Sequence, residues 1–157
     1  MEKINEILFN KKYIELLNKL ELLESDRVFC KHTMEHFLDL ARIAYIRVLE
    51  EKLDYSKEVI YAIALLHDIG RVLEYEKGIP HHEGSVIIAH EILEETSYNK
   101  EERGLIISAI ENHRNVNSTD LNNIIYTSDK LSRNCFSCKS EKECYWSKEK
   151  KNLKIRY

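Results

Sequence analysis

The stretch Ile60-Tyr61-Ala62-Ile63-Ala64-Leu65-Leu66-His67-Asp68-Ile69-Gly70 is the most informative part of this sequence. An apolar run typical of a buried helix ends there in an imidazole and a carboxylate, and Gly70 is expected to stop the helix. Burying two such groups is costly unless a partner compensates them. A divalent metal ion binds both side chains well, so the stretch favours a metal-dependent enzyme.

The composition indicates an all-helical fold. The chain has 157 residues, enough for one domain with a core, and only 4 Gly and 1 Pro. So few turn residues disfavour a fold of many short strands. We therefore expect an all-α bundle of about six helices in a single domain, residues 1–157, with its core at about 30–133 and a Cys-containing tail at 134–157.

The net charge and the hydropathy of the chain indicate which classes of partner and which cellular location to expect. The net charge of −3 provides no electrostatic case for nucleic acid as an obligatory partner. No apolar run approaches the ~20 residues that cross a bilayer, and the N-terminus lacks the apolar core of a signal peptide. We expect no membrane association and a cytoplasmic location, where cysteines are reduced rather than paired.

Periodic apolar residues and capping signals predict where the helices lie. Ser56 is a candidate N-cap, Asn99 followed by Glu102 is another, and Ser118, Thr119 or Asp120 begins the last helix. A loop is expected from Glu74 to Pro80. The predicted helical regions are about 4–23 (one or two helices), 31–53, 56–67, 81–95, 99–112 and 118–131.

Histidines and aspartates lie near the expected ends of separate helices, where side chains can converge on one cleft. Taken singly, each has an ordinary alternative as a hydrogen-bonded core residue or a solvated surface residue. For His32 we favour that alternative, as a supporting or surface residue. The candidate ligands are His36, His67, Asp68, His81 or His82, His113 and Asp129.

These residues resemble the H…HD…D signature of the HD-domain superfamily of metal-dependent phosphohydrolases. Arg71 stands where the superfamily usually has lysine, and Ser128 where it usually has alanine. The resemblance covers about Cys30 to Arg133 and implies an all-α bundle. The set looks most like small bacterial HD proteins that hydrolyse dinucleoside tetraphosphates symmetrically with a di-iron centre. The segments that carry the resemblance are His36-Phe37-Leu38-Asp39-Leu40-Ala41, Leu65-Leu66-His67-Asp68-Ile69-Gly70-Arg71 and Ser128-Asp129-Lys130-Leu131.

The resemblance implies a role for each candidate ligand. A first metal would be held by His36, His67, Asp68 and Asp129. Asp68 would bridge to a second metal on His81 and His113, with His82 as the rival of His81. Imidazoles with carboxylates suit iron, manganese, cobalt, nickel or zinc better than magnesium, and the analogy puts iron first.

The expected activity is hydrolysis of a nucleotide or dinucleotide phosphate ester or anhydride at a mono- or dinuclear centre, with Asp68 central to it. Arg71, Lys130 and Arg133 are the candidate phosphate contacts, and ordinary surface or helix-terminal charge is their alternative. The expected partner is a small phosphorylated molecule, with a homodimer left open. A metal-containing nucleotide-sensing module without turnover is the competing function, and di-iron oxygenase chemistry has no specific support.

The cysteines form a second constellation. Cys135-Phe136-Ser137-Cys138 is a C-x-x-C motif, Cys144 follows it, and Cys30 lies just before the helix of His36. If Asp129 approaches His36, the segment after it passes near Cys30. Four thiolates could then hold a structural zinc ion or an iron–sulfur cluster. Zinc is put ahead of a cluster, and ordinary reduced thiols remain the alternative.

Overall fold

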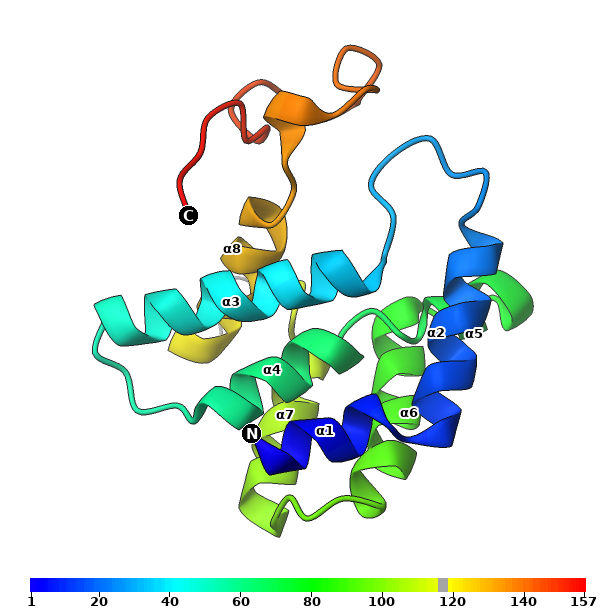
Figure 1. Ribbon diagram of the computed structural model, residues 1–157, viewed down its shortest axis with the longest axis vertical. Helices are drawn as coiled ribbons and strands as arrows, with labels where there is room; N and C mark the ends of the chain where they lie inside the picture. The colour runs from blue at the N-terminus through cyan, green and yellow to red at the C-terminus, as the bar shows by residue number, and fades with distance from the viewer. Residues whose placement is uncertain (116–118) are drawn as a thin grey trace.

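Helices account for all the regular secondary structure in residues 1–115 and 119–157, which the computed structural model describes (Figure 1). These ranges contain no strand, so the all-α prediction is confirmed. A 3₁₀ helix, Cys135–Ser137, follows the last α-helix. The α-helices are α1 (Glu2–Leu8), α2 (Lys11–Leu23), α3 (Met34–Glu50), α4 (Lys57–Leu66), α5 (Arg71–Lys77), α6 (His81–Glu94), α7 (Lys100–Glu111) and α8 (Asp120–Leu131).

The helix α4 forms the centre of the core. Its residues are buried on every face except near its start, as an all-round apolar helix requires. It packs against α1, α3 and α7, and α8 packs against α3. Figure 1 shows α3 and α4 crossing the molecule as neighbouring layers, with α2, α5 and α6 grouped at one end.

The predicted helix starts agree with the structure at three of the caps. Ser56 Oγ accepts from Val59 N, and Thr119 Oγ1 accepts from Asn122 N. Asn99 and Glu102 form a reciprocal capping box at the start of α7. The alternative start at Ser118 lies outside the described residues.

Two expected boundaries are wrong. The helix expected from about 31 begins at Met34, because Thr33 caps it, so His32 lies before the helix rather than on its face. The loop expected at 74–80 is largely helical: α5 continues to Lys77 and ends at Gly78, whose φ of 70° is readily adopted only by glycine. This extra helix, and the division of the first region into α1 and α2, bring the number of described helices above the six expected.

Gly70 is required for a different reason from the one expected. Its backbone is right-handed, with φ −67°, so it is not a left-handed helix stop. A Cβ atom there would lie 2.0 Å from Ser85 N and 2.3 Å from His81 O. The turn after α4 thus touches the backbone of α6, and Gly70 N donates to Ser85 Oγ at 2.9 Å. This close crossing brings the start of α6 next to the end of α4.

The segment after α8 returns over the loop that joins α2 to α3, residues 24–33. Asn152 Nδ2 donates to Lys130 O at 2.6 Å, and Ser140 Oγ donates to Val28 O at 3.2 Å. Figure 1 shows this orange and red segment beside the end of α8. Within the described ranges, no helix has the length and apolar character needed to cross a bilayer.

Candidate metal centre

The candidate ligands come from the ends or interiors of different helices, and all except His82 are buried. His67 caps the end of α4, and Asp68 follows it. His36 and Asp129 lie on the neighbouring helices α3 and α8. His81 begins α6, and His113 follows the end of α7.

A first group of ligand atoms comprises the side chains of His36, His67, Asp68 and Asp129. One ligand atom from each lies within 4.8 Å of all the others. His67 Nε2 is 3.3 Å from Asp68 Oδ2, and His36 Nε2 is 3.3 Å from Asp129 Oδ1. Two imidazoles and two carboxylates in this arrangement match the donors of a mid-transition-series divalent ion.

A second group uses the other face of Asp68. Asp68 Oδ1 is 3.4 Å from His81 Nε2 and 3.8 Å from His113 Nε2. One ligand atom from each of these three side chains lies within 4.8 Å of the other two. One oxygen of Asp68 therefore faces His67, and the other faces His81 and His113. A carboxylate placed in this way can bridge two metal ions.

Hydrogen bonds on the opposite side of each ring orient the histidines. The carbonyls of Ala64 and Ile110 lie 2.8 Å and 2.5 Å from Nδ1 of His67 and His113. A carbonyl can only accept, so in the neutral ring Nδ1 carries the proton and Nε2 carries the lone pair. Such supporting bonds fix the tautomer and orientation of metal-binding histidines.

Ser132 orients His36 in the same way. Its hydroxyl donates to Asp129 O at 2.7 Å and so accepts from His36 Nδ1 at 2.9 Å. Arg133 Nη2 lies 2.9 Å from His36 Nε2 and donates to it. The proton of His36 therefore lies on Nδ1, and the lone pair of Nε2 accepts from Arg133, a contact that a metal ion in the first group would replace.

Two buried ligand atoms have no hydrogen-bond partner, His67 Nε2 and Asp68 Oδ1, although the latter forms an ion pair with Arg71 at 3.4 Å. Buried polar atoms are rarely left unpaired in folded proteins. A cation in each group would compensate one of these atoms, so the residues present fit a pair of divalent ions.

The electrostatics favour the metal-binding protonation states of His36, His113 and Asp68. At His67, burial opposes protonation, but nearby carboxylates raise the pKa of the ring. Burial lowers the pKa of His36 and of His113 to about 4, so both rings are neutral near pH 7. Burial works against ionisation of Asp68, but His67, His32 and Arg71 outweigh it and hold the pKa of the carboxyl well below its usual range. Neutral imidazoles and an ionised carboxylate are the forms that bind a metal.

The structure separates His81 from His82. His81 is buried, its Nε2 faces Asp68, and its Nδ1 lies 3.3 Å from Glu74 Oε1. His82 is partly exposed, and its closest acidic neighbour is Glu83 at 4.0 Å. The geometry thus brings His81 into the second group and leaves His82 out.

His32 is the main residue that sequence reasoning undervalued. It is buried, its Nδ1 lies 2.7 Å from Glu24 Oε1, and its Nε2 lies 3.3 Å from Asp68 Oδ2. An imidazole held by a carboxylate on one side and directed into the site on the other resembles the supported ligands. Its spacing of four residues from His36 was the available signal, but the loop before α3, rather than a shared helical face, brings it there.

A cavity of about 260 Å³ opens onto these groups. The three cations expected to contact phosphate all line it, and each already contacts the ligand set. Arg71 Nε is 3.4 Å from Asp68 Oδ1, Lys130 contacts Asp129, and Arg133 contacts His36. The sequence interpretation did not include two further cations of the lining, Arg27 and Arg114, or its aromatic residues Phe29, Tyr145 and Trp146.

The four cysteines lie together beside this cavity, and none forms a disulfide. All four line an adjoining cavity, where Arg133 is shared between the two sites. Their sulfurs are not among the described groups of three or more ligand atoms within 4.8 Å of one another. The fold therefore gathers the cysteines without the tight spacing of a tetrahedral zinc site.

Comparisons with known proteins agree with this architecture. The chain is 49% identical to an uncharacterized protein of Clostridium beijerinckii over 157 residues, the whole of both chains. A crystal structure from an uncultured Thermotogales bacterium, described as a predicted HD superfamily hydrolase, matches with a TM-score of 0.63 and 22% identity. That match covers 89% of this chain and 81% of the other, and at this identity it shows the fold alone. A sequence model of the HD domain matches residues 33–134, so this chain belongs to the HD-domain family.

Proposed function

We propose that this protein is a metal-dependent phosphohydrolase that acts on a nucleotide or dinucleotide phosphate at a dinuclear His/Asp centre. HD domains typically bind divalent metals and hydrolyse phosphate esters or anhydrides, and the fold and family of this chain agree with that activity. The placement of Asp68 carries the dinuclear proposal, because its two oxygens face two separate groups of histidines. When bound, two such ions supply Lewis-acid activation of water and charge neutralisation at phosphorus.

The residues of this chain divide the remaining work between them. Asp68 is held ionised between the two ligand groups, where its carboxylate would be shared by both metal ions. Arg71 and Arg133 lie beside the ligand groups and would bind phosphoryl oxygens as charge develops on them. The side chain of Lys130, which contacts Asp129, would provide a further phosphate contact.

A nucleotide is favoured over a simple phosphate ester because the cavity combines cations with aromatic side chains. Phe29 and Tyr145 make an edge-to-face contact with ring centroids 6.1 Å apart, and Trp146 lines the same cavity. Aromatic faces stack on nucleobases irrespective of base identity. Arg27 and Arg114 add positive charge to this lining, as a polyphosphate chain requires.

The finer parts of the proposal are iron as the preferred metal and a dinucleoside polyphosphate as the preferred substrate. Both follow from the resemblance of the motifs and are consistent with the imidazole and carboxylate donors. We further propose that the protein works in the cytoplasm on a small-molecule substrate. A net charge of −3 offers no general attraction to nucleic acid.

The test combines metal analysis with phosphate release from a panel of nucleotides and dinucleoside polyphosphates. Asp68→Ala should lose bound metal from both groups and reduce turnover by at least about 10²-fold, the scale of removing a preorganised electrostatic contact. The matched control is Asp54→Ala, at an exposed position between α3 and α4 that does not line the cavity. Full activity of the Asp68 variant would overturn the site. Binding of nucleotide without turnover by the metal-loaded parent would instead support the nucleotide-sensing alternative.

A further inference from the structure

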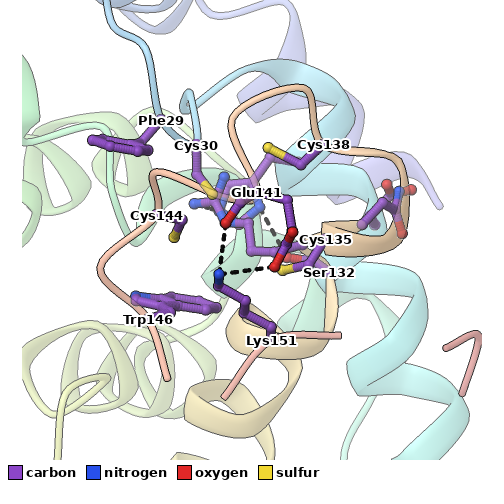
Figure 2. Close-up of a pocket in the computed structure, with 13 residues that line it drawn as sticks. Phe29, Cys30, Ser132, Cys135, Cys138, Glu141, Cys144, Trp146 and Lys151 are labelled. Atoms are coloured by element: carbon purple, nitrogen blue, oxygen red, sulfur yellow. Dashed lines mark hydrogen bonds and ion pairs between the residues drawn. The ribbon is translucent and has the colours of Figure 1, made fainter. Parts of the chain in front are cut away.

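The four cysteines of this chain surround one cavity of about 210 Å³. Cys30 comes from the loop between α2 and α3, while Cys135, Cys138 and Cys144 come from the segment after α8. Figure 2 shows their side chains on different sides of this space, between Phe29, Trp146 and Lys151. Chance placement does not explain why every cysteine of a 157-residue chain lines the same cavity.

Two positively charged side chains accompany the thiols. Lys151 is buried, donates to Glu141 O at 2.6 Å and pairs with the Glu141 carboxylate at 2.9 Å. It also lies close enough to Cys135 and Cys144 to interact with them electrostatically. Burial raises the pKa of the Cys30 thiol, and Arg133 acts against this rise. Four thiolates around a metal centre leave a net negative charge, which Lys151 and Arg133 would offset.

The spacing of the sulfurs distinguishes between the metal centres that four thiolates can hold. A zinc ion with Zn–S bonds of about 2.3 Å draws its four sulfurs to about 3.8 Å from one another. Among the described ligand groups, no three cysteine sulfurs fall within even 4.8 Å of one another. A cubane iron–sulfur cluster holds its cysteine sulfurs farther apart, because each binds a different iron. The open cavity and its aromatic walls suit the larger centre.

We propose that Cys30, Cys135, Cys138 and Cys144 bind a [4Fe–4S] cluster, which fastens the C-terminal segment to the loop before α3. Each thiol loses its proton to solvent when it binds one iron. Two ferric ions, two ferrous ions and four sulfide ions come from outside the chain, so no residue of the chain is oxidised or reduced. Since Cys30 and Cys144 also line the cavity of the His/Asp centre, the cluster would fix the wall formed by Tyr145 and Trp146. This site does not depend on the proposed hydrolase activity.

The test measures iron, zinc and acid-labile sulfide per chain in protein purified without oxygen, and again after anaerobic reconstitution with ferric iron, sulfide and a thiol reductant. The parent should show a brown visible absorbance, sulfide accompanied by iron, and an electron paramagnetic resonance signal after dithionite reduction. Zinc without sulfide would overturn the cluster in favour of a zinc site. Absence of sulfide and of any cysteine-dependent metal would overturn the site altogether.

Matched variants assign the sulfide to the cysteines. Cys138→Ser changes an exposed side chain, so it should remove the sulfide and the signal with little effect on packing. Ser137→Ala alters the exposed neighbour inside the same motif and should retain both. Asp68→Ala should lose the metal of the His/Asp centre and keep the sulfide. A Cys138 variant that retains the full sulfide content would contradict the ligand set. If a variant fails to fold, the sulfide content of the parent protein still decides the proposal.

Discussion

Single residues show that the side chains of the candidate metal centre are already oriented for metal binding. Asp68 is buried, unprotonated and directed at two ligand groups, and one of its oxygens lacks a hydrogen-bond partner. The rings of His67 and His113 are each held through Nδ1 by a backbone carbonyl. Such preorganisation limits the entropy that the side chains lose on binding metal, and it makes individual substitutions informative.

The adjacent histidines at the start of α6 provide the sharpest comparison. His81→Ala should lose metal from the second group and reduce phosphate release by at least about 10-fold to 100-fold, because Nε2 of His81 faces Asp68. His82→Ala should keep the metal content and activity of the parent, since its ring lies outside both groups. Metal content and turnover measured on both variants check this. The reverse pattern would assign the ligand to His82.

Tyr13 and Tyr98 are buried tyrosines with opposite hydrogen bonding. Tyr13 Oη has no partner, whereas Tyr98 Oη donates to Glu58 O at 2.9 Å. Removing an unsatisfied hydroxyl relieves its desolvation cost, so Tyr13→Phe should raise the free energy of unfolding by about 1 kcal/mol, and Tyr98→Phe should lower it by about 1 kcal/mol. Urea unfolding of the two variants measures both changes. Equal effects of the same sign would contradict the assignment.

At the scale of elements, the contact between the end of α4 and the start of α6 decides whether the site forms. Gly70 and Gly84 face each other across this contact, and the Cβ that Gly84 lacks would lie 2.9 Å from Gly70 O. Backbones this close leave no room for side chains. The crossing brings His81 to Asp68, although the two residues belong to different elements.

Gly70→Ala tests this crossing. The added methyl group would meet backbone atoms of α6, which cannot move aside, so we expect a loss of about 3 kcal/mol or more in unfolding free energy. Gly104→Ala is the matched control in α7, where a Cβ meets nothing within 4 Å, and a gain of about 0.5–1 kcal/mol is expected from helix propensity. Thermal or urea unfolding compares the two. A Gly70 variant as stable as the parent would disprove the close approach.

For the whole molecule, the buried histidines link stability to pH. The pKa of His36 and of His113 lies at about 4 in the folded protein because of burial, against an ordinary value of 6.5. Between these values the unfolded chain binds more protons than the folded one, so folding stability falls as the pH decreases from about 6.5 to about 4. His67 acts in the opposite sense: although its burial opposes protonation, nearby carboxylates raise its pKa.

We therefore expect the metal-free protein to unfold at progressively lower urea concentrations between pH 7 and pH 4.5. Burial also lowers the pKa of His32 and His81. Four buried histidines therefore destabilise the folded protein as the pH decreases, and only His67 has the opposite effect. Chelator-treated protein unfolded in urea at several pH values measures the effect. His113→Gln should give a shallower dependence over the same range. Stability that rises on acidification would contradict the neutral state of these rings.

The sequence alone determined the helical class, the starts of α4, α6, α7 and α8, and the residue types of the site. Ser56, Asn99 and Thr119 cap helices through local hydrogen bonds, and local chemistry is visible in a linear pattern. The H…HD…D signature likewise placed the chain in its family. The cations that follow the ligand motifs in the sequence, Arg71, Lys130 and Arg133, line the cavity of the site.

Only the tertiary structure decided which histidine of the pair His81 and His82 faces Asp68, and that His32 faces it as well. It also supplied the reason for Gly70 and gathered Cys30 with cysteines more than a hundred positions away. These outcomes depend on how α4 crosses α6 and on where the loop before α3 meets the C-terminal segment. Contacts between distant parts of a chain depend on how helices and loops pack together. A local sequence pattern shows which residues share a helix, but it does not show which distant residues they meet.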